Sequence, residues 1–192
     1  MHLRRHANAT TTPRTRAYVA IDRATRFVYL EILPDRRAAT AAGFLERFLD
    51  RFPLPVHTIL TDNGSEFTDR FAVDKKAKPH DKPSGTHAFD RLCTARAITH
   101  RLTRPFRPQT NGMVERFNRR LGQHLNRVPQ NRSAHHRRFL DHAERDAYLQ
   151  AFVADYNRTR LRCLDYQAPA ELLAKLAGHN TKAGKTIRAE AE

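Results

Sequence analysis

Two acidic residues of this sequence each lie next to an Asn-Gly pair. Asp62 occurs in the stretch LTDNGSEF, and Glu115 occurs in PQTNGMVERFN. Carboxylates can hold two Mg²⁺ ions about 3.5–4 Å apart, and such a pair of ions clamps the attacking and leaving oxygens of a phosphodiester. Mg²⁺ prefers a few carboxylates plus substrate phosphate to a complete protein cage. Asp62 and Glu115 are therefore candidate ligands of a phosphoryl-transfer site.

Each acid also has a simpler interpretation. Asp62 could open a turn by bonding its own backbone, and Glu115 could stabilise the start of a helix through the helix dipole. The surroundings of Glu115 bear on the choice, because residues 91–138 contain twelve arginines and no other acid. A lone carboxylate among so many arginines suits an ion-pair partner, and it equally suits a metal ligand beside bound phosphates.

The charge of the whole chain indicates a polyanionic partner. The sequence of 192 residues has a formal net charge of +15, and arginine, the better fork for phosphate, supplies most of it. The alternative is a basic protein with no specific partner. We expect six arginines to bind DNA phosphates on or beside the face that carries Glu115: Arg101, Arg104, Arg107, Arg116, Arg119 and Arg120.

Several other classes of protein are disfavoured. The two cysteines, Cys93 and Cys163, have no CxxC or Cys/His ligand spacing, so neither a disulfide framework nor a zinc site is predicted, and a reducing compartment is expected. No apolar run approaches the length of a membrane span, and the N-terminal residues lack the apolar core of a secretory signal.

The periodicity of apolar residues predicts the elements that must position the two acids. Two strands, at 17–22 and 27–33, form a predicted hairpin. A helix over 36–52 places five apolar residues on one face: Phe44, Leu45, Phe48, Leu49 and Phe52. The next predicted elements are a strand at 56–60, a short helix that begins within 65–72, a loop at 74–87, a helix at 88–97 and a strand at 98–102. A loop at 103–112 leads to a long helix from Met113, which a break at 129–138 ends. A helix at 140–160, with Tyr148, Phe152 and Tyr156 on one stripe, and a last helix at 168–177 complete the prediction.

This order of elements indicates an α/β fold in which helices flank a mixed sheet. Asp62 then lies at the C-terminal end of a strand, at the rim where open α/β sheets bind ligands. Glu115 lies in the first turn of the long helix, beside the core-facing Val114. We expect the two carboxylates to meet at one end of the sheet.

The same stretches resemble a known family. LTDNGSEFTDRF, HRLTRPFRPQTNGMVERFNRRL and YVAIDRATRFVYLEILPD resemble the integrase catalytic core of bacterial insertion-sequence transposases, which are relatives of retroviral integrases with a ribonuclease-H-like fold. FVADYNRTRLRCLDYQAPAELL resembles the C-terminal pattern of this family. The resemblance covers residues 17–175, and PQTNGMVERFNR argues against a ribonuclease-H-type nuclease.

The resemblance implies cleavage and strand transfer at DNA ends by a triad of two aspartates and a glutamate with two Mg²⁺ or Mn²⁺ ions. Asp62 matches the second acid and Glu115 the third, although the fifty-two residues between them exceed the interval of retroviral members. The family also implies DNA partners, a homo-oligomer when active, and a cytoplasmic location on the bacterial nucleoid.

The first acid of the triad has no clear counterpart. Asp22, in AIDRATR, matches a structural turn residue of the family, close to Thr25 and Arg26. We therefore doubt that Asp22 is the missing member of the triad. The first acid should lie upstream, but residues 1–16 contain no carboxylate, so we expect a truncated N-terminal strand. Glu66 is no obvious substitute, because it follows the turn where the chain should be leaving the sheet edge.

We therefore divide the chain into a basic N-terminal remnant, a core-like domain with a C-terminal helical extension, and a polar tail, at residues 1–16, 17–176 and 177–192. Two functions remain open at this point. The chain is either a metal-dependent transposase core that is inactive as written, or a non-catalytic nucleic-acid-binding remnant of a transposase.

Overall fold

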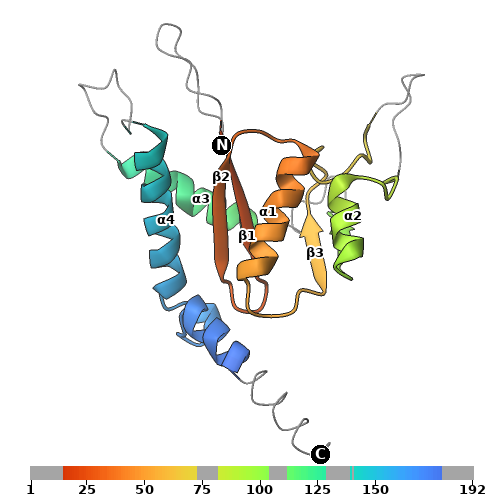
Figure 1. Cartoon of the computed structure of the whole chain (residues 1–192). Coiled ribbons are helices and arrows are strands. Elements are labelled where there is room, and N and C mark those ends of the chain that lie inside the picture. Colours follow the sequence, from red (N-terminus) through yellow and green to blue (C-terminus); the bar gives the residue numbers. More distant parts are fainter. Residues whose placement is uncertain (1–14, 73–81, 104–111, 129–138, 140, 179–192) are drawn as a thin grey trace, which may run out of the picture. The chain divides into compact units, whose positions relative to one another are not determined.

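The structure is a computed structural model, and it describes residues 15–72, 82–103, 112–128, 139 and 141–178. The chain forms two compact units. The first comprises Met1–Tyr18, Glu31–Arg51 and Pro55–Gly122, and the second comprises Val19–Leu30, Phe52–Leu54 and Gln123–Glu192. Strands and helices together give the mixed α/β fold that the sequence predicts (Figure 1).

The first two strands form the predicted hairpin. Strands β1 (Arg16–Ile21) and β2 (Val28–Leu33) make a two-stranded sheet. Their connection is closed by hydrogen bonds from Asp22 N to Phe27 O and from Arg26 N to Asp22 O, both 2.9 Å. Arg26 adopts a positive φ of 62°, which a tight turn requires.

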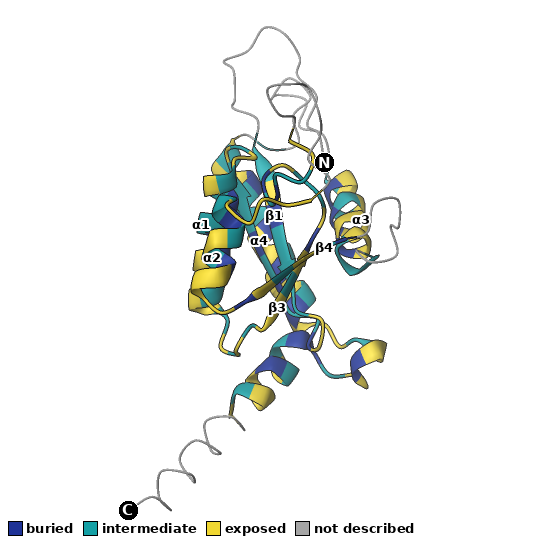
Figure 2. Cartoon of the chain, turned by 90° about the vertical axis from the view of Figure 1, so that its right-hand side faces the viewer, coloured by how far each residue is buried: buried dark blue, intermediate teal, exposed yellow. Residues whose placement is uncertain are grey.

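Helix α1 (Ala38–Arg51) follows the hairpin and buries the face predicted from its apolar spacing. Phe44, Leu45 and Phe48 are all buried, whereas Leu49 is half-buried and Phe52 lies after the last residue of the helix. The chain enters the helix through Asp35, whose Oδ1 accepts hydrogen bonds from Arg37 N at 3.0 Å and from the Thr40 hydroxyl at 2.6 Å. Figure 2 colours α1 by burial, and the helix contains buried as well as exposed residues.

The second sheet consists of β3 (Thr58–Thr61) and β4 (Thr99–Leu102), which pair in parallel with Thr61 opposite Leu102. Parallel neighbours need a crossover connection, and α2 (Ala88–Ala95) lies in that crossover. Phe89 and Cys93 are the buried side chains of α2. Because both strands run in the same direction, their C-terminal ends meet at one edge of the sheet.

The predicted short helix at residues 65–72 is wrong. This segment contains turns, and only Phe67 N and Thr68 N bond back to Gly64 O. The hydroxyl of Thr68 then accepts a hydrogen bond from Arg70 N at 3.1 Å. A Thr side chain that takes a nearby backbone N–H competes with helix formation, and this competition ends the segment after one turn.

Two long helices follow, α3 (Gly112–Arg127) and α4 (His142–Arg158), then a 3-10 turn at Arg162–Leu164 and a helical segment at 169–178. The predicted stripe of α4 is only half-buried. The fully buried stripe is its neighbour, and it contains two polar residues as well as apolar ones: Arg145, Leu149, Val153 and Asn157. Tyr148 and Phe152 instead contact the ring of His124 on α3, at centroid distances of 5.1 and 4.5 Å.

Some predicted features cannot be compared with the structure. The loops at 74–87 and 103–112 and the break at 129–138 lie wholly or largely outside the described residues, as do the N-terminal and C-terminal segments. Across the residues that the structure describes, no helix combines the length and apolar character needed to cross a bilayer.

Candidate functional site

Asp62 is an exposed residue directly after β3. Its Oδ1 accepts a hydrogen bond from Gly64 N at 2.9 Å, so one carboxylate oxygen fixes the turn. The next residue ties this turn to the neighbouring strand, because Asn63 Nδ2 donates to Thr103 O at 3.0 Å. The Asn side chain therefore joins the C-terminal ends of the two parallel strands and holds the Asp62 turn at the sheet edge.

The carboxylate of Glu66 lies beside Asp62, at a position where we expected the chain to be leaving the sheet edge. Its carboxylate is buried and accepts two hydrogen bonds of 2.8 Å from Nε and Nη2 of Arg36. A Cβ placed on Gly64 would lie 2.6 Å from Glu66 Oε2 and 3.0 Å from Asp62 Oδ1. The two carboxylates thus flank the same glycine, and a side chain at this position would force at least one of them to shift.

The ionic state of Arg36 follows from these neighbours. Hydrogen bonding to Glu66 and the charge of Glu66 raise the pKa of Arg36, and the charge of Asp62 raises it further. The acid pair is therefore accompanied by one fixed cation. A bidentate Arg–carboxylate pair also has a defined geometry, unlike most surface ion pairs.

Phe67, which follows the Asp62 turn, belongs to a cluster of aromatic side chains. Tyr18 packs against Phe44 and Phe67 at centroid distances of 5.4 and 6.3 Å, and Phe67 packs against Phe89 at 5.2 Å. The Tyr18 hydroxyl donates to Asp35 O at 3.1 Å. Burial, with the nearby charge of Glu66, raises the pKa of Tyr18 to about 12, so this hydroxyl keeps its proton.

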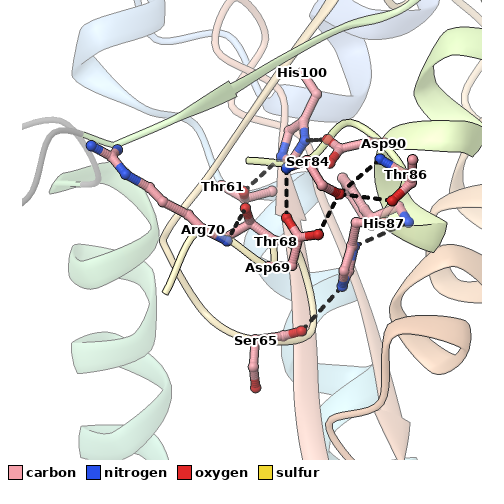
Figure 3. A network of polar contacts seen from close by, with 11 residues as sticks. Thr61, Ser65, Thr68, Asp69, Arg70, Ser84, Thr86, His87, Asp90 and His100 are labelled. Atoms are coloured by element: carbon pink, nitrogen blue, oxygen red, sulfur yellow. Dashed lines mark hydrogen bonds and ion pairs between the residues drawn. The ribbon is translucent and has the colours of Figure 1, made fainter. Parts of the chain in front are cut away.

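A buried polar chain runs from α2 through β4 to the residue before Asp62 (Figure 3). Asp90 Oδ1 bonds Nδ1 of His100, and Nε2 of His100 lies 2.8 Å from the Thr61 hydroxyl. The side chain of His100 is almost fully buried. These three residues fix the end of β3 against β4, and no motif in the sequence indicates them.

Further contacts in Figure 3 attach the turn to the segment that precedes α2. Asp69 accepts hydrogen bonds from the backbone N–H and the hydroxyl of Ser84, which lower the pKa of Asp69. The His87 ring bonds Ser65 O at 3.2 Å. The segment at residues 62–69 is therefore held at several points, and the exposed carboxylate of Asp62 is presented from an ordered base.

Glu115 lies in the first turn of α3 and is exposed. The segment that joins β4 to α3 lies outside the described residues, so the pairing of Glu115 with Asp62 stays a prediction. Of the six predicted DNA-binding arginines, Arg104 and Arg107 lie outside the described residues. The other four are exposed: Arg101 on β4, and Arg116, Arg119 and Arg120 on α3.

Asp22 makes the local contacts that are typical of a turn residue. Its Oδ2 accepts hydrogen bonds from Thr25 N at 2.7 Å and from the Thr25 hydroxyl at 2.6 Å. The backbone carbonyl of Asp22 accepts a further hydrogen bond, from Arg26 N at 2.9 Å. These contacts use the same carboxylate oxygen twice.

Within the described residues, the groups around Asp62 do not make up a complete metal site. Among the described residues, no three His, Cys, Asp or Glu side chains come together in a way that could hold a metal ion. Glu66, the acid beside Asp62, is already bonded to Arg36 through both of its oxygens. We therefore derive no reaction step through a metal ion from the described residues.

The sequence can now be compared with known proteins. Residues 5–108 match an integrase core domain family, and residues 96–169 match a second integrase core domain family. The first match alone covers more than half of the chain. This chain belongs to the integrase core family.

Related structures and sequences agree with this assignment. The integrase core of this chain is similar in fold to the catalytic core domain of BIV integrase, with a TM-score of 0.58, 22% sequence identity, and coverage of 91% of this chain and 93% of the other. A Caenorhabditis elegans relative, uncharacterized protein K02A2.6, is 23% identical over 153 residues. That match covers 80% of this chain but only 10% of the relative, so the integrase core spans about a tenth of its length.

Proposed function

We propose that this integrase core comes from a DNA transposition system, that it binds DNA ends, and that residues 1–192 alone do not catalyse strand transfer. The observation that carries the proposal is the Asp62 turn. An exposed carboxylate is held at the C-terminal edge of a parallel strand pair, in an integrase-core chain whose net charge is +15. The insertion-sequence origin, a location on the bacterial nucleoid and a homo-oligomeric active form belong to the same proposal.

The DNA-binding part of the proposal rests on charge. Phosphate contacts by Lys and Arg release counterions from DNA, so affinity falls steeply as salt concentration rises. The exposed arginines on α3 follow Glu115 along the helix, and residues 91–138 contain no other acid. Contacts of this kind position a duplex and depend weakly on its sequence.

The catalytic part rests on the acids. Integrase core domains generally depend on divalent metal ions. Chemistry with two ions needs both to be held at once, and the predicted ligands of this chain are Asp62 and Glu115. Residues 1–16 supply no carboxylate, and Asp22 is engaged by Thr25. This favours a core that binds DNA without joining it, which is also the expected behaviour of a non-catalytic remnant.

Binding is tested by fluorescence anisotropy with a labelled duplex of random sequence over a salt series. We expect affinity to fall by orders of magnitude between about 50 and 200 mM salt. Substituting Arg116, Arg119 and Arg120 together by Gln should lower the slope of log affinity against log salt. The matched control removes the same charge by substituting three exposed arginines at and after the C-terminal end of α4: Arg158, Arg160 and Arg162. Affinity that is insensitive to salt contradicts the proposal.

Catalysis is tested with labelled DNA ends and Mg²⁺ or Mn²⁺. We expect no joined product from residues 1–192, and we expect a product from a chain extended upstream by a strand that carries an Asp. A product from the unextended chain that disappears in Asp62→Asn would show that this chain holds its own third acid. In that case Asp22→Asn is the first variant to compare.

A further inference from the structure

Arg36 differs from the arginines that the sequence singles out, because its guanidinium is already fixed next to Asp62. Nε and Nη2 form a two-point contact with Glu66, whose side chain is only 10% exposed, while the Arg36 side chain is 49% exposed. Two N–H groups of the guanidinium therefore bond Glu66, while about half of the Arg36 side chain remains exposed to solvent. A guanidinium has five N–H donors, so three remain for another partner.

The backbone that carries Arg36 is also fixed. On its N-terminal side, Asp35 O accepts the hydroxyl of the buried Tyr18. On its C-terminal side, Arg37 N and the Thr40 hydroxyl both bond the Asp35 carboxylate. Contacts on both sides of the residue, together with the fork to Glu66, restrict the guanidinium to one place. Less entropy is then lost when the exposed edge binds a ligand.

The ligand must be an anion that can lie beside a carboxylate. The carboxylates of Asp62 and Glu66 both lie against Gly64, and the charge of Asp62 acts on Arg36. Glu66 neutralises part of the charge of Arg36, but its own burial turns it away from solvent. The exposed chemistry at the end of β3 is thus one carboxylate, Asp62, beside one N–H edge of a guanidinium, which matches the oxygens of a phosphodiester.

We infer that Arg36 is a DNA-contact residue of this site, held by Glu66 so that its free edge binds a backbone phosphate of the DNA next to Asp62. The inference rests on the proposed function, since it assumes that the integrase core binds DNA. Its content is separate, because it names a residue outside the arginine-rich segment 91–138. Glu66 acts as a positioning residue that orients Arg36 and makes no contact with DNA.

The structure offers a matched control for this pair. Arg47 and Glu31 form the same kind of fork, with bonds of 3.0 and 2.6 Å from Nε and Nη2, and their side chains are 45% and 14% exposed. Glu31 also has Arg51 at 3.6 Å. The inference assigns DNA contact to Arg36 and none to Arg47.

The test uses double variants that keep the net charge unchanged. Arg36→Gln/Glu66→Gln removes one positive and one negative charge, and it leaves no buried acid without its partner. Arg47→Gln/Glu31→Gln does the same at the control pair. Binding of the random-sequence duplex is measured over a salt series, and circular dichroism with thermal unfolding checks that both variants fold.

We expect the Arg36/Glu66 variant to bind DNA more weakly and to lower the slope of log affinity against log salt by about one, as loss of one phosphate contact requires. The Arg47/Glu31 variant should bind like the unmodified chain. Equal effects of the two double variants, or no effect of Arg36→Gln/Glu66→Gln, would overturn the inference while the proposed function stands. No binding by the unmodified chain at low salt would overturn the proposed function itself.

The single variant Glu66→Gln separates positioning from net charge. It raises the net charge by one, so a purely long-range attraction predicts tighter binding. If Glu66 orients Arg36, binding should stay the same or weaken despite the added charge, whereas Glu31→Gln should show the small gain expected from charge alone. Equal gains in both single variants would remove the positioning role from Glu66.

Discussion

At the scale of single residues, the Asp62 turn depends on a position without a side chain. Gly64 lies between the carboxylates of Asp62 and Glu66, and the Glu66 carboxylate cannot move away freely because Arg36 holds both of its oxygens. A larger residue at this position would have to displace one of the two carboxylates. Gly64 of the Asn-Gly pair therefore allows Glu66 to pack beside Asp62, which the sequence motif alone does not indicate.

Substitution Gly64→Ala should destabilise the fold by about 1–3 kcal/mol, the usual cost of overpacking, because a new Cβ would lie 2.6 Å from Glu66 Oε2. Gly122, inside α3, is the control, since an added Cβ there meets nothing within 4 Å. Gly122→Ala should stabilise by about 0.5–1 kcal/mol through the lower entropy of the unfolded chain. Chemical denaturation measures both, and a neutral Gly64→Ala would show that the Glu66 side chain yields easily.

At the scale of elements, α4 supplies polar groups to the backbone of β2. The amide of Asn157 accepts from Val28 N at 2.9 Å and donates to Val28 O at 2.8 Å, and Gln150 Nε2 donates to Leu30 O at 3.0 Å. Asn157 and Val28 are both buried. A side-chain amide here pairs with the strand as a neighbouring strand would, which satisfies backbone groups of β2 without a further strand.

Replacing Asn157 with Leu should destabilise the fold by about 2–4 kcal/mol, because a buried N–H and a buried C=O of Val28 both lose their amide partner. The control is Gln150→Ala on the same helix, which removes one bond and should cost about 1 kcal/mol. Urea unfolding followed by circular dichroism measures the difference. Equal costs for the two substitutions would mean that the backbone of Val28 finds other partners.

At the scale of the whole molecule, charge dominates. Thirty-five basic and twenty acidic side chains leave a net charge of +15, so the folded chain carries strong self-repulsion in addition to its attraction for polyanions. Several of the acids are bound to arginines in local pairs, such as Arg36 with Glu66 and Arg47 with Glu31. The remaining excess of positive charge attracts counterions from solution.

Raising the concentration of potassium chloride from about 10 to 100 mM should increase the melting temperature, because the Debye length falls from about 30 to 10 Å and like charges are screened. Over the same range the affinity for DNA should fall. Differential scanning fluorimetry and anisotropy measure the two responses. A melting temperature that falls with salt would show that the local ion pairs outweigh the net repulsion.

The sequence by itself determined the family, the net charge and most of the elements. The spacing of Phe44, Leu45 and Phe48 fixes the buried face of α1, because residues three and four apart share one side of a helix wherever that helix packs. Apolar periodicity is a property of neighbouring positions. The turn around Asp62 is also local, because Asp62 Oδ1 accepts a hydrogen bond from the backbone N–H of Gly64, two residues later.

Only the tertiary structure decided which polar groups pair over long separations. Glu66 bonds Arg36, thirty residues away, and Asn157 bonds Val28, 129 residues away. A hydrogen bond requires its two heavy atoms to approach within about 3 Å, so its partner depends on how distant segments are folded against each other. Local patterns carry no such information, and for this reason Glu66 read as a residue leaving the sheet edge although the fold holds it beside Asp62.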